Sequence, residues 1–326
     1  MAQTTTVSLP GQANLAGADT ALFLKMFSGE VMATFDEKQV FQSLVRMKNV
    51  GAGRSHQFPA IGTADASYHA RGENLLDPAN GYLSQIEHGE RTIQVDKTLL
   101  SSTFVDEWDM KIAHYEYRGE YARQLGEALA NKTDKTIAQV IALAARSGAT
   151  LSATQDPAKN GTVISKADVR NTPSLMIDAM VEAATAFAQK NVPMEDVTFC
   201  VRPSMFFELQ KQGDLLNVDF GNSGNGSQAM GTIVKGYGFK IIWSNHIPST
   251  TIAAQTGELN TYAGNFSDTQ ALAWHKDCVG SVMRQGVITE SEKRIDYQGD
   301  LVVAKLMVGH GILRPECAVE IVDPNT

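Results

Sequence analysis

The chain has 326 residues, of which 43% are hydrophobic and 20% charged, and its formal net charge is −8. This length exceeds that of an average domain about twofold, so we expect two domains or one discontinuous domain with a substantial core. The negative charge excludes a broad basic surface of the kind that binds nucleic acid directly. The N-terminus lacks the features of a signal peptide, and no apolar run approaches the roughly 18 residues of a membrane span. We therefore expect a soluble protein that is made in a cytoplasm.

The N-terminal segment is polar at first and then amphipathic. Residues 1–18 are rich in Thr, Gly, Ala and Gln, which predicts a flexible arm. Apolar side chains from Phe23 to Phe35 recur at helical spacing after two possible N-caps, Asp19 and Thr20, so we predict a helix over residues 19–35. Residues 40–50 predict an extended segment.

Residues 57–97 contain short β-like runs, such as residues 92–95, among turn residues and acids. The segment has few large apolar residues, which favours a long projecting hairpin over a packed core. Residues 61–110 hold nine acidic and three basic side chains, so most of the net charge lies here. A solvated acidic surface would explain this concentration equally well. Because two strands alone are only marginally stable, we expect the hairpin to find partners outside its own domain.

The rest of the chain predicts helices mixed with short strands. Residues 115–146 keep apolar side chains at helical spacing over a length that indicates a spine helix. Thr172 followed by Pro173 is a cap and first-turn signal for a second helix that ends near residue 190. Residues 149–171 predict a loop, and residues 203–213 predict a third helix. Strands are predicted at 197–201, 239–243, 270–274, 286–292, 300–308 and 316–322. This mixture indicates an α+β architecture.

The residue types that support catalysis do not occur at catalytic spacings. Residues 231–238 have the GxxxxG spacing of a phosphate loop, but Tyr237 and Gly238 replace its Lys and Ser/Thr. The seven histidines form neither HxH nor HExxH, and the three cysteines form no CxxC, so we expect free thiols. The acids at 106, 107 and 109 could bind a hard cation, but they fit the first turn of a helix better. We predict no enzymatic activity, metal or cofactor, and a function that depends on the shape of the protein.

Four blocks of sequence resemble the major capsid proteins of short-tailed bacteriophages (podoviruses) that encode their own RNA polymerase. The first block is ALFLKMFSGEVMATF at 21–35, and the second follows QFPxxGxxxAxYxxxGENL from Gln57 to Leu75. The third follows RxEYxxQLGExLA at 118–130. The fourth is YQxDxxxAK at 297–305, which leads into GHGxLRPE at 309–316.

This resemblance implies the α+β Hong Kong 97-type phage capsid fold. The implied parts are an N-terminal arm (1–50), an extended loop (51–100), a peripheral domain (101–190, with the spine helix at about 115–146 and a further part at about 276–300) and an axial domain (191–326, with its final strands near 300–322). It also implies self-assembly as hexamers and pentamers into an icosahedral shell around double-stranded DNA, with no sequence-specific DNA binding. A scaffolding protein and a portal are implied partners, a decoration protein is a further candidate, and no membrane is involved.

A closed shell needs contacts between non-identical faces, so we expect the acidic loop of one subunit to lie on the spine helix of the next. The acids Glu73, Asp77 and Glu87 would then face basic residues on that helix. The full set of candidate assembly residues is Phe58, Pro59, Tyr68, Glu73, Asp77, Glu87, Arg118, Arg123, Lys132, Lys135 and Arg314.

Two other functions remain open from the sequence. One is an encapsulin, which is a cellular compartment with the same fold that loads an enzyme through a peptide tag. The other is a cytosolic hydrolase, which the missing nucleophile and metal motifs disfavour.

Overall fold

A computed structural model describes residues 31, 34–35, 39–62, 64, 66–77, 82, 86–108, 118–149, 159–211, 226–227, 232–233 and 235–325. The predicted arm at 1–18 and most of the predicted helix at 19–35 lie outside these residues, although residues 31, 34 and 35 are helical. The chain divides into two compact units. Unit 1 comprises 1–39, 97–133 and 285–308, and unit 2 comprises 40–96, 134–284 and 309–326. None of the helices described is long and apolar enough to cross a membrane.

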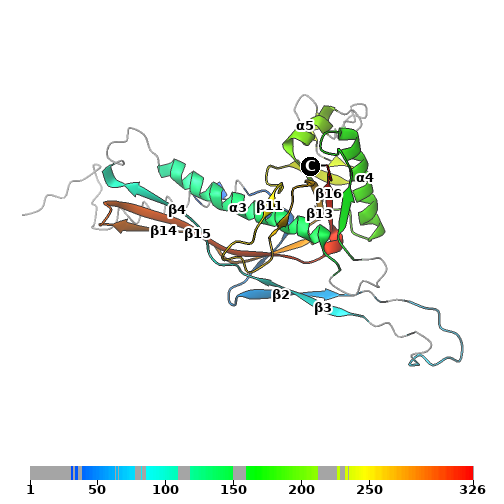
Figure 1. Cartoon of the computed structure of the whole chain (residues 1–326). Helices are drawn as coiled ribbons and strands as arrows, with labels where there is room; N and C mark the ends of the chain where they lie inside the picture. The colour runs from blue at the N-terminus through cyan, green and yellow to red at the C-terminus, as the bar shows by residue number, and fades with distance from the viewer. Residues whose placement is uncertain are drawn as a thin grey trace, which may run out of the picture. The chain divides into compact units, whose positions relative to one another are not determined.

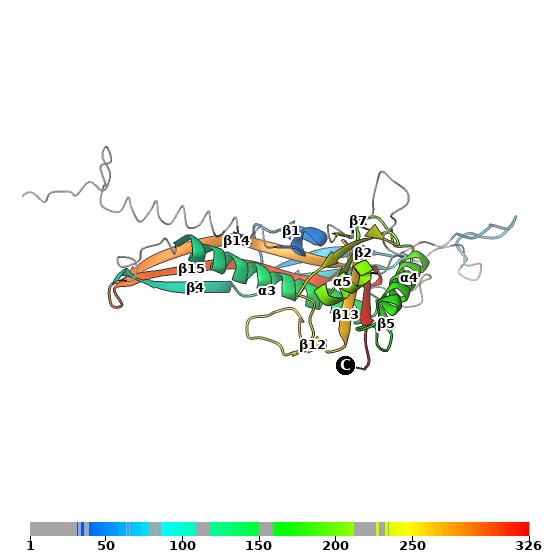
Figure 2. The ribbon, with the colours of Figure 1, turned by 90° about the horizontal axis from the view of Figure 1, so that it is seen from above.

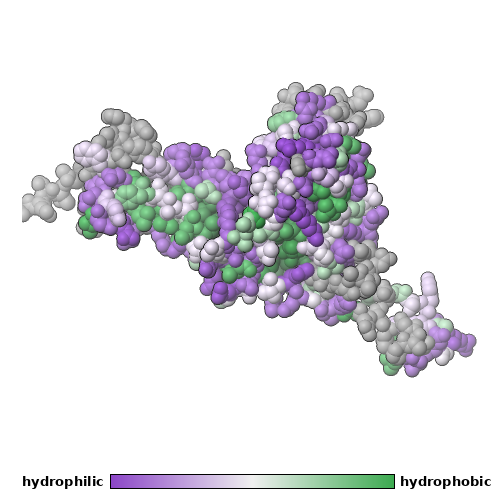
Figure 3. Space-filling view, in the orientation of Figure 1, coloured by the Kyte–Doolittle hydropathy of each residue, from purple (hydrophilic) through white to green (hydrophobic). Residues whose placement is uncertain are grey.

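The described part of unit 1 includes half of a long helix and three long strands (Figures 1 and 2). Its strands are β4 (Leu99–Asp106) and the outer parts of β14 (Val279–Arg294) and β15 (Gly299–Ile312), and β4 pairs with β15 in antiparallel register from Leu99↔Leu306 to Asp106↔Gly299. The first half of helix α3 (Arg118–Arg146) belongs to the same unit. Apolar side chains also reach the surface of this unit, as green patches over α3 and the strands in Figure 3.

Helix α3 confirms the predicted spine helix from residue 118 onward. Its buried residues in unit 1 include Ala122, Leu125 and Leu129, which recur at helical spacing. At Gly126 the chain from residues 31–35 comes so close that a Cβ would lie 2.6 Å from the carbonyl oxygen of Val31. Only glycine fits this contact, which explains one glycine of the third sequence block.

Unit 2 is organised around a six-stranded mixed sheet of order β5-β16-β13-β6-β10-β9. β13 pairs antiparallel with β16 and β6, whereas β6–β10 and β16–β5 are parallel. The bounds are β5 (Thr162–Ser165), β16 (Ala318–Val322), β13 (Thr269–His275), β6 (Val197–Val201), β10 (Phe239–Trp243) and β9 (Lys235–Gly236). Helices α4 (Pro173–Gln189) and α5 (Pro203–Lys211) lie beside this sheet in Figure 1.

The core of unit 2 combines the sheet with the second half of α3 and with α4. Its largest fully buried side chains include Trp274, Phe187 and Phe199. Residues 134–190 therefore belong with the later strands. The two compact units therefore divide between residues 133 and 134, whereas the predicted domain boundary lies at 190. The reason is that α4 and the end of α3 bury their apolar faces in this core.

The predicted hairpin is present in unit 2. Strands β2 (Ser55–Ile61) and β3 (His88–Gln94) pair antiparallel from Ser55↔Gln94 to Ile61↔His88. Only Phe58 in β2 and Ile93 in β3 are buried. A two-stranded ribbon with so little apolar burial has no core of its own.

Two local predictions need correction. Residues 162–165, predicted as loop, form strand β5, because a short apolar pair there completes the edge of the sheet beside β16. Residues 40–50 are not extended throughout. They contain the 3-10 helix Gln42–Leu44 followed by β1 (Arg46–Asn49), which pairs parallel with the base of β14. The buried Asp134 carboxylate accepts hydrogen bonds from the N–H groups of Val40 (2.9 Å) and Phe41 (3.2 Å), which holds the chain in this turn.

Most of the remaining predicted strands and helices are observed within a few residues of their predicted bounds, but the strand predicted at 286–292 begins earlier and spans Val279–Arg294 as β14. The shorter elements are β7 (Gly226–Ser227), β8 (Thr232–Ile233), β11 (Thr251–Ile252), β12 (Gly264–Asn265) and the 3-10 helix Pro315–Cys317. Helix α4 begins after Thr172 with Pro173 in its first turn, as the sequence predicts.

Candidate assembly surface

The hairpin exposes apolar side chains near its outer end. Leu75 is 53% exposed, Leu76 70% and Ile61 63%, and Tyr68 is fully exposed. Single exposed apolar residues are ordinary, but several on one poorly packed ribbon form an exposed apolar surface.

The tip of the hairpin is ordered by polar contacts centred on Glu73. The Tyr82 hydroxyl donates a hydrogen bond to the Glu73 carboxylate and accepts one from the Ala70 N–H (3.0 Å). The His69 ring nitrogen Nε2 lies 2.9 Å from the Glu73 carbonyl oxygen, and Gly72 adopts a φ of +95°. Next to it, Asn74 Oδ1 accepts from the Leu76 N–H (3.1 Å). The second sequence block therefore encodes a structured turn that presents its leucines to solvent.

The inner end of the hairpin is held by a second polar network, around Asp96. Its carboxylate accepts hydrogen bonds from the N–H of Leu259 (2.7 Å), the side-chain amide of Asn260 (3.1 Å) and the hydroxyl of Tyr262. Asn260 also donates to the carbonyl oxygen of Gln94, the last residue of β3 (2.7 Å). Burial raises the pKa of Asp96 despite these donors, and burial beside Asp96 raises the pKa of Tyr262.

The GHG sequence of the fourth block lies against this inner end. A Cβ on Gly309 would lie 1.9 Å from the Gln94 carbonyl oxygen, and one on Gly311 would lie 2.7 Å from Ile93. Between them, His310 is fully buried, and burial lowers its pKa to about 3. Its Nδ1 lies 2.7 Å from Ser281 Oγ. The two glycines thus allow β15 and the end of β3 to touch, with a neutral histidine between them.

The predicted cations of α3 differ in their surroundings. Arg123 is bonded within its own helix to Glu120 (2.6 Å) and Glu127 (3.2 Å). Its hydrogen bond lowers the pKa of Glu120 to about 2. Lys135 is exposed and Lys132 half-buried, whereas the side chain of Arg118 lies outside the part of the chain that the structure describes. Since its own helix already supplies two carboxylates, Arg123 is the weaker candidate for a contact with another subunit.

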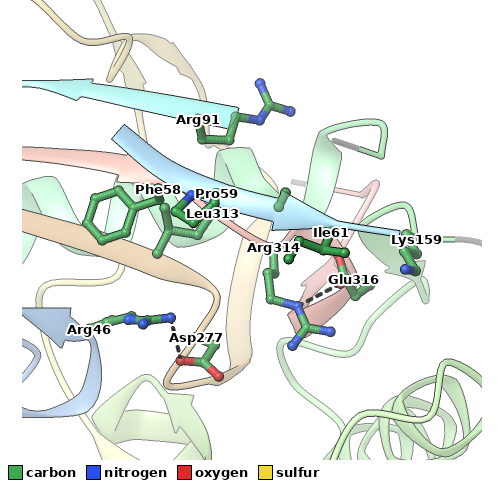
Figure 4. A pocket seen from close by; sticks show the side chains of 11 residues that line it. Arg46, Phe58, Pro59, Ile61, Arg91, Lys159, Asp277, Leu313, Arg314 and Glu316 are labelled. Atoms are coloured by element: carbon green, nitrogen blue, oxygen red, sulfur yellow. Dashed lines mark hydrogen bonds and ion pairs between the residues drawn. The ribbon is translucent and has the colours of Figure 1, made fainter. Parts of the chain in front are cut away.

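A pocket in unit 2 brings together three of the predicted assembly residues. Its volume is about 450 Å³, and Phe58, Pro59 and Arg314 all line it. Figure 4 shows Phe58 and Pro59 beside Leu313, with the side chains of Arg46 and Arg314 on one side of β2. The complete lining is Arg46, Phe58, Pro59, Ala60, Ile61, Arg91, Lys159, Asp277, Leu313, Arg314 and Glu316.

Each of the two acids that line the pocket is paired with one of its arginines. Arg314 Nε lies 2.8 Å from the buried Glu316 carboxylate, and Arg46 lies 3.8 Å from Asp277. Sequence reasoning missed Arg46, Lys159 and Asp277, which come from separate turns and strands. No local sequence pattern predicts these three residues, because the pocket forms only where the ends of β1, β2, β13 and β15 meet.

Within the described residues, no cluster of three or more His, Cys, Asp or Glu side chains could hold a metal ion. Cys200, Cys278 and Cys317 are free and buried, as predicted. Burial raises the pKa of all three thiols, to about 12 for Cys317, so they stay protonated and unreactive at neutral pH.

The sequence and structure were compared with those of known proteins. The Gp10A-like family, described as major capsid protein, matches residues 57–322. The major capsid protein of Escherichia phage T7 is 29% identical over 331 residues, covering 94% of this chain and 93% of that protein. That of Enterobacteria phage T3 is 28% identical over 340 residues, covering 97% and 95%.

Among solved structures, the capsid of the cyanophage P-SCSP1u matches with a TM-score of 0.77 at 32% identity, covering 88% of this chain and 89% of that one. This likeness confirms the predicted α+β fold of the Hong Kong 97 type. The sequence likeness over nearly the whole chain confirms the resemblance carried by the four blocks, and it favours the phage capsid over the encapsulin alternative. The chain belongs to the Gp10A-like family and is a bacteriophage major capsid protein, a structural component of the shell of the virion.

Proposed function

We propose that the subunits assemble as hexamers and pentamers into an icosahedral shell around double-stranded phage DNA. The observation that carries this proposal is the match of residues 57–322 to major capsid proteins, together with a hairpin that has almost no core of its own. A ring of subunits needs contacts between different faces of the same chain. A ribbon that buries its exposed apolar side chains on a neighbour supplies such a contact.

The proposed roles of the segments follow from the family. Residues 1–50 act as the arm, 51–100 as the extended loop, 101–190 with 276–300 as the peripheral domain, and 191–326 as the axial domain. The hairpin β2–β3 supports the second assignment. The packing of residues 134–190 with the strands of unit 2 argues for a boundary inside α3, between Thr133 and Asp134.

In this proposal the hairpin overlaps a neighbouring subunit, and Glu73, Asp77 and Glu87 face basic groups there. On α3, the exposed Lys135 is the best placed of the predicted partners. Exposed ion pairs contribute only about 0–1 kcal/mol each, so their effect depends on repetition over the many copies of a shell.

The net charge of −8 supports a shell that encloses DNA without binding its phosphates tightly. We propose that the inner surface is neutral to acidic and that the protein has no catalytic role. Assembly would take place in the cytoplasm of the bacterial host, with a scaffolding protein and a portal. A decoration protein could join the finished shell.

The test is expression of the chain with its scaffolding protein, followed by size-exclusion chromatography and electron microscopy. Shells in the void volume are expected, and a small oligomer under all conditions would overturn the proposal. Reversing Glu73, Asp77 and Glu87 to Lys should lower shell yield and change its dependence on salt. Unchanged yield and salt dependence would contradict the proposal that these three acids face basic groups on a neighbouring subunit. A denaturing gel should show monomers, because we expect no covalent cross-links between subunits.

A further inference from the structure

One face of the sheet in unit 1 is left uncovered by the described part of the chain. On β15 the side chains of Val302, Ala304 and Leu306 are buried, and Figures 1 and 2 show α3 on one side of the strands. Because successive side chains of a strand alternate between the two faces, the residues between these three point the other way. Leu301 and Val303 are accordingly only half-buried.

The neighbouring strands add larger apolar side chains to the uncovered face. Leu100 and Phe104 on β4 are 59% and 43% exposed, and Phe104 lies directly opposite Leu301 in the register of the two strands. On β14, Ile288 is 43% exposed, whereas both of its neighbours in the strand are buried. We call these residues the open sheet face: Leu100, Phe104, Ile288, Leu301 and Val303.

The central charges of the open sheet face pair with each other. Lys305 lies directly opposite Leu100 and forms an ion pair with Glu290, two residues after Ile288. This pair also shows that Ile288 shares the face of Leu100, because residues two apart in a strand point the same way. A partner for this face therefore needs apolar side chains rather than an opposite charge.

The size of the open sheet face limits what can cover it. Three strands of about seven residues each make a face of about 23 Å by about 14 Å, or roughly 300 Å². A stable dimer buries about 800 Å² on each partner, so two such faces packed on each other are too small to hold two copies together. A narrow element with a few apolar side chains fits this area.

The tip of the hairpin is such an element. Tyr68 is fully exposed, and Leu75 and Leu76 are 53% and 70% exposed. The turn that carries them is ordered before any contact, through the hydrogen bond from the Tyr82 hydroxyl to the Glu73 carboxylate, so little conformational entropy is lost when it binds. The tip thus presents three apolar side chains on a preformed turn.

We propose that the tip of the hairpin of one subunit, through Tyr68, Leu75 and Leu76, docks on the open sheet face of a second copy. This inference rests on the overlap proposed above, and it names the sheet, rather than α3, as the surface that receives the tip. Each copy carries both halves of the contact, so the contact can repeat around a ring. Burial of apolar surface is what stabilises it.

Cross-linking between two copies tests the location of the tip. A chain with Leu76→Cys is assembled together with a tagged chain that carries Leu100→Cys, and the shells are treated with a short bismaleimide. The three native cysteines are buried, so wild-type shells serve as the blank. A parallel assembly pairs Leu76→Cys with Lys135→Cys on α3. On a denaturing gel we expect a dimer of a tagged and an untagged chain with Leu100→Cys, and at least severalfold less of it with Lys135→Cys.

The other outcomes each overturn the inference. A dimer that forms as well or better with Lys135→Cys places the tip on α3 and leaves the overlap itself intact. A dimer of two tagged chains, in shells that carry Leu100→Cys alone, shows that two sheet faces cover each other. Shells without a dimer in either assembly overturn the inference and the overlap on α3 alike.

A charge exchange tests whether the two surfaces touch. Leu76→Asp and Leu100→Lys each place a charge in an apolar contact and should each lower shell yield at least severalfold. The double variant should restore the yield to within about twofold of wild type, because the two new charges pair. In the matched control, Leu76→Asp is combined with Val181→Lys, at a 43% exposed position on α4, and the yield should stay low. Thermal melting of each purified subunit checks that it is folded, and Ile288→Lys is used if Leu100→Lys is not. Equal yields for the exchange and control combinations would overturn the inference.

Discussion

The ring nitrogen Nδ1 of His310 lies 2.7 Å from the hydroxyl oxygen of Ser281, and both side chains are buried. The other ring nitrogen, Nε2, has no hydrogen-bond partner among the described residues. A charged imidazolium would therefore leave one donor unsatisfied in a buried site, which explains why burial lowers the pKa of His310 to about 3.

This histidine should make the subunit sensitive to acid. The folded protein keeps His310 neutral down to about pH 3, whereas the unfolded chain binds a proton below about pH 6.5. The free energy of unfolding should therefore fall as the pH decreases from about 6.5, by up to about 1.4 kcal/mol per pH unit. Urea unfolding of the subunit at pH 7 and pH 5 measures this effect, which amounts to about 2 kcal/mol.

The variant His310→Asn keeps a polar group beside Ser281 but does not titrate, so its pH dependence should be flatter than that of wild type. The exposed His88→Asn is the control and should retain the wild-type slope. An equal pH dependence of the free energy of unfolding in all three proteins would contradict the role given to His310.

The network at the inner end of the hairpin predicts the effect of Tyr262→Phe. The Tyr262 hydroxyl donates a hydrogen bond to Asp96 and accepts one from the backbone N–H of His310 (2.9 Å). The change to Phe removes both hydrogen bonds. A loss of about 1–3 kcal/mol in the free energy of unfolding is expected. Hydrogen exchange should also become faster in β3. Tyr68→Phe, on a fully exposed side chain, should change neither, and faster exchange in both variants would show that the network does not hold the hairpin.

Gly309 should tolerate no side chain. In Gly309→Ala, the new Cβ would lie 1.9 Å from the backbone oxygen of Gln94, so the strands must move apart. Overpacking of this kind costs about 1–3 kcal/mol, and the rigid backbone contact places this case at the upper end. Gly286→Ala on β14, with nothing within 4 Å of its Cβ, is the matched control. A lower melting temperature and less soluble subunit are expected for the first variant only.

Two arginines of α3 should differ in their effect on stability. Arg146 binds the fully buried carboxylate of Glu320 through two hydrogen bonds of 2.6 Å and packs over Phe266, with 5.2 Å to the ring centroid. Its replacement by Ala leaves a buried charge unpaired, which costs about 3–5 kcal/mol. Arg123→Ala removes only exposed pairs within the helix and should leave the melting temperature nearly unchanged. Similar melting temperatures for both variants would mean that Glu320 finds another partner.

Much of the local structure follows from short stretches of sequence. The period of apolar residues predicts α3, and the Thr172–Pro173 pair predicts the start of α4. The lack of large apolar residues around residues 57–97 predicts a ribbon without a core. Strand β5 escaped prediction because four residues at a sheet edge carry too little pattern of their own.

For the candidate assembly surface too, the sequence identified some of the residues, but not how they are arranged in space. The sequence singled out Phe58, Pro59 and Arg314 through motif blocks, but it did not place them in one pocket or add Arg46 and Asp277 to them. It also named Arg123 as a candidate partner for the acids of a neighbouring subunit, whereas the structure pairs Arg123 with Glu120 and Glu127 of its own helix.

By itself, then, the sequence determined most of the described helices, the ribbon and the family, because periodicity, composition and motif order are properties of neighbouring residues. The tertiary structure decided which charges are neutralised and where a cavity forms. Asp134 accepts hydrogen bonds from the N–H groups of Val40 and Phe41, more than ninety residues away in the chain. Arg46 pairs with Asp277, more than two hundred and thirty residues away, in a pocket that Arg314 also lines. Such long-range contacts depend on strand order and register, which no local sequence pattern specifies.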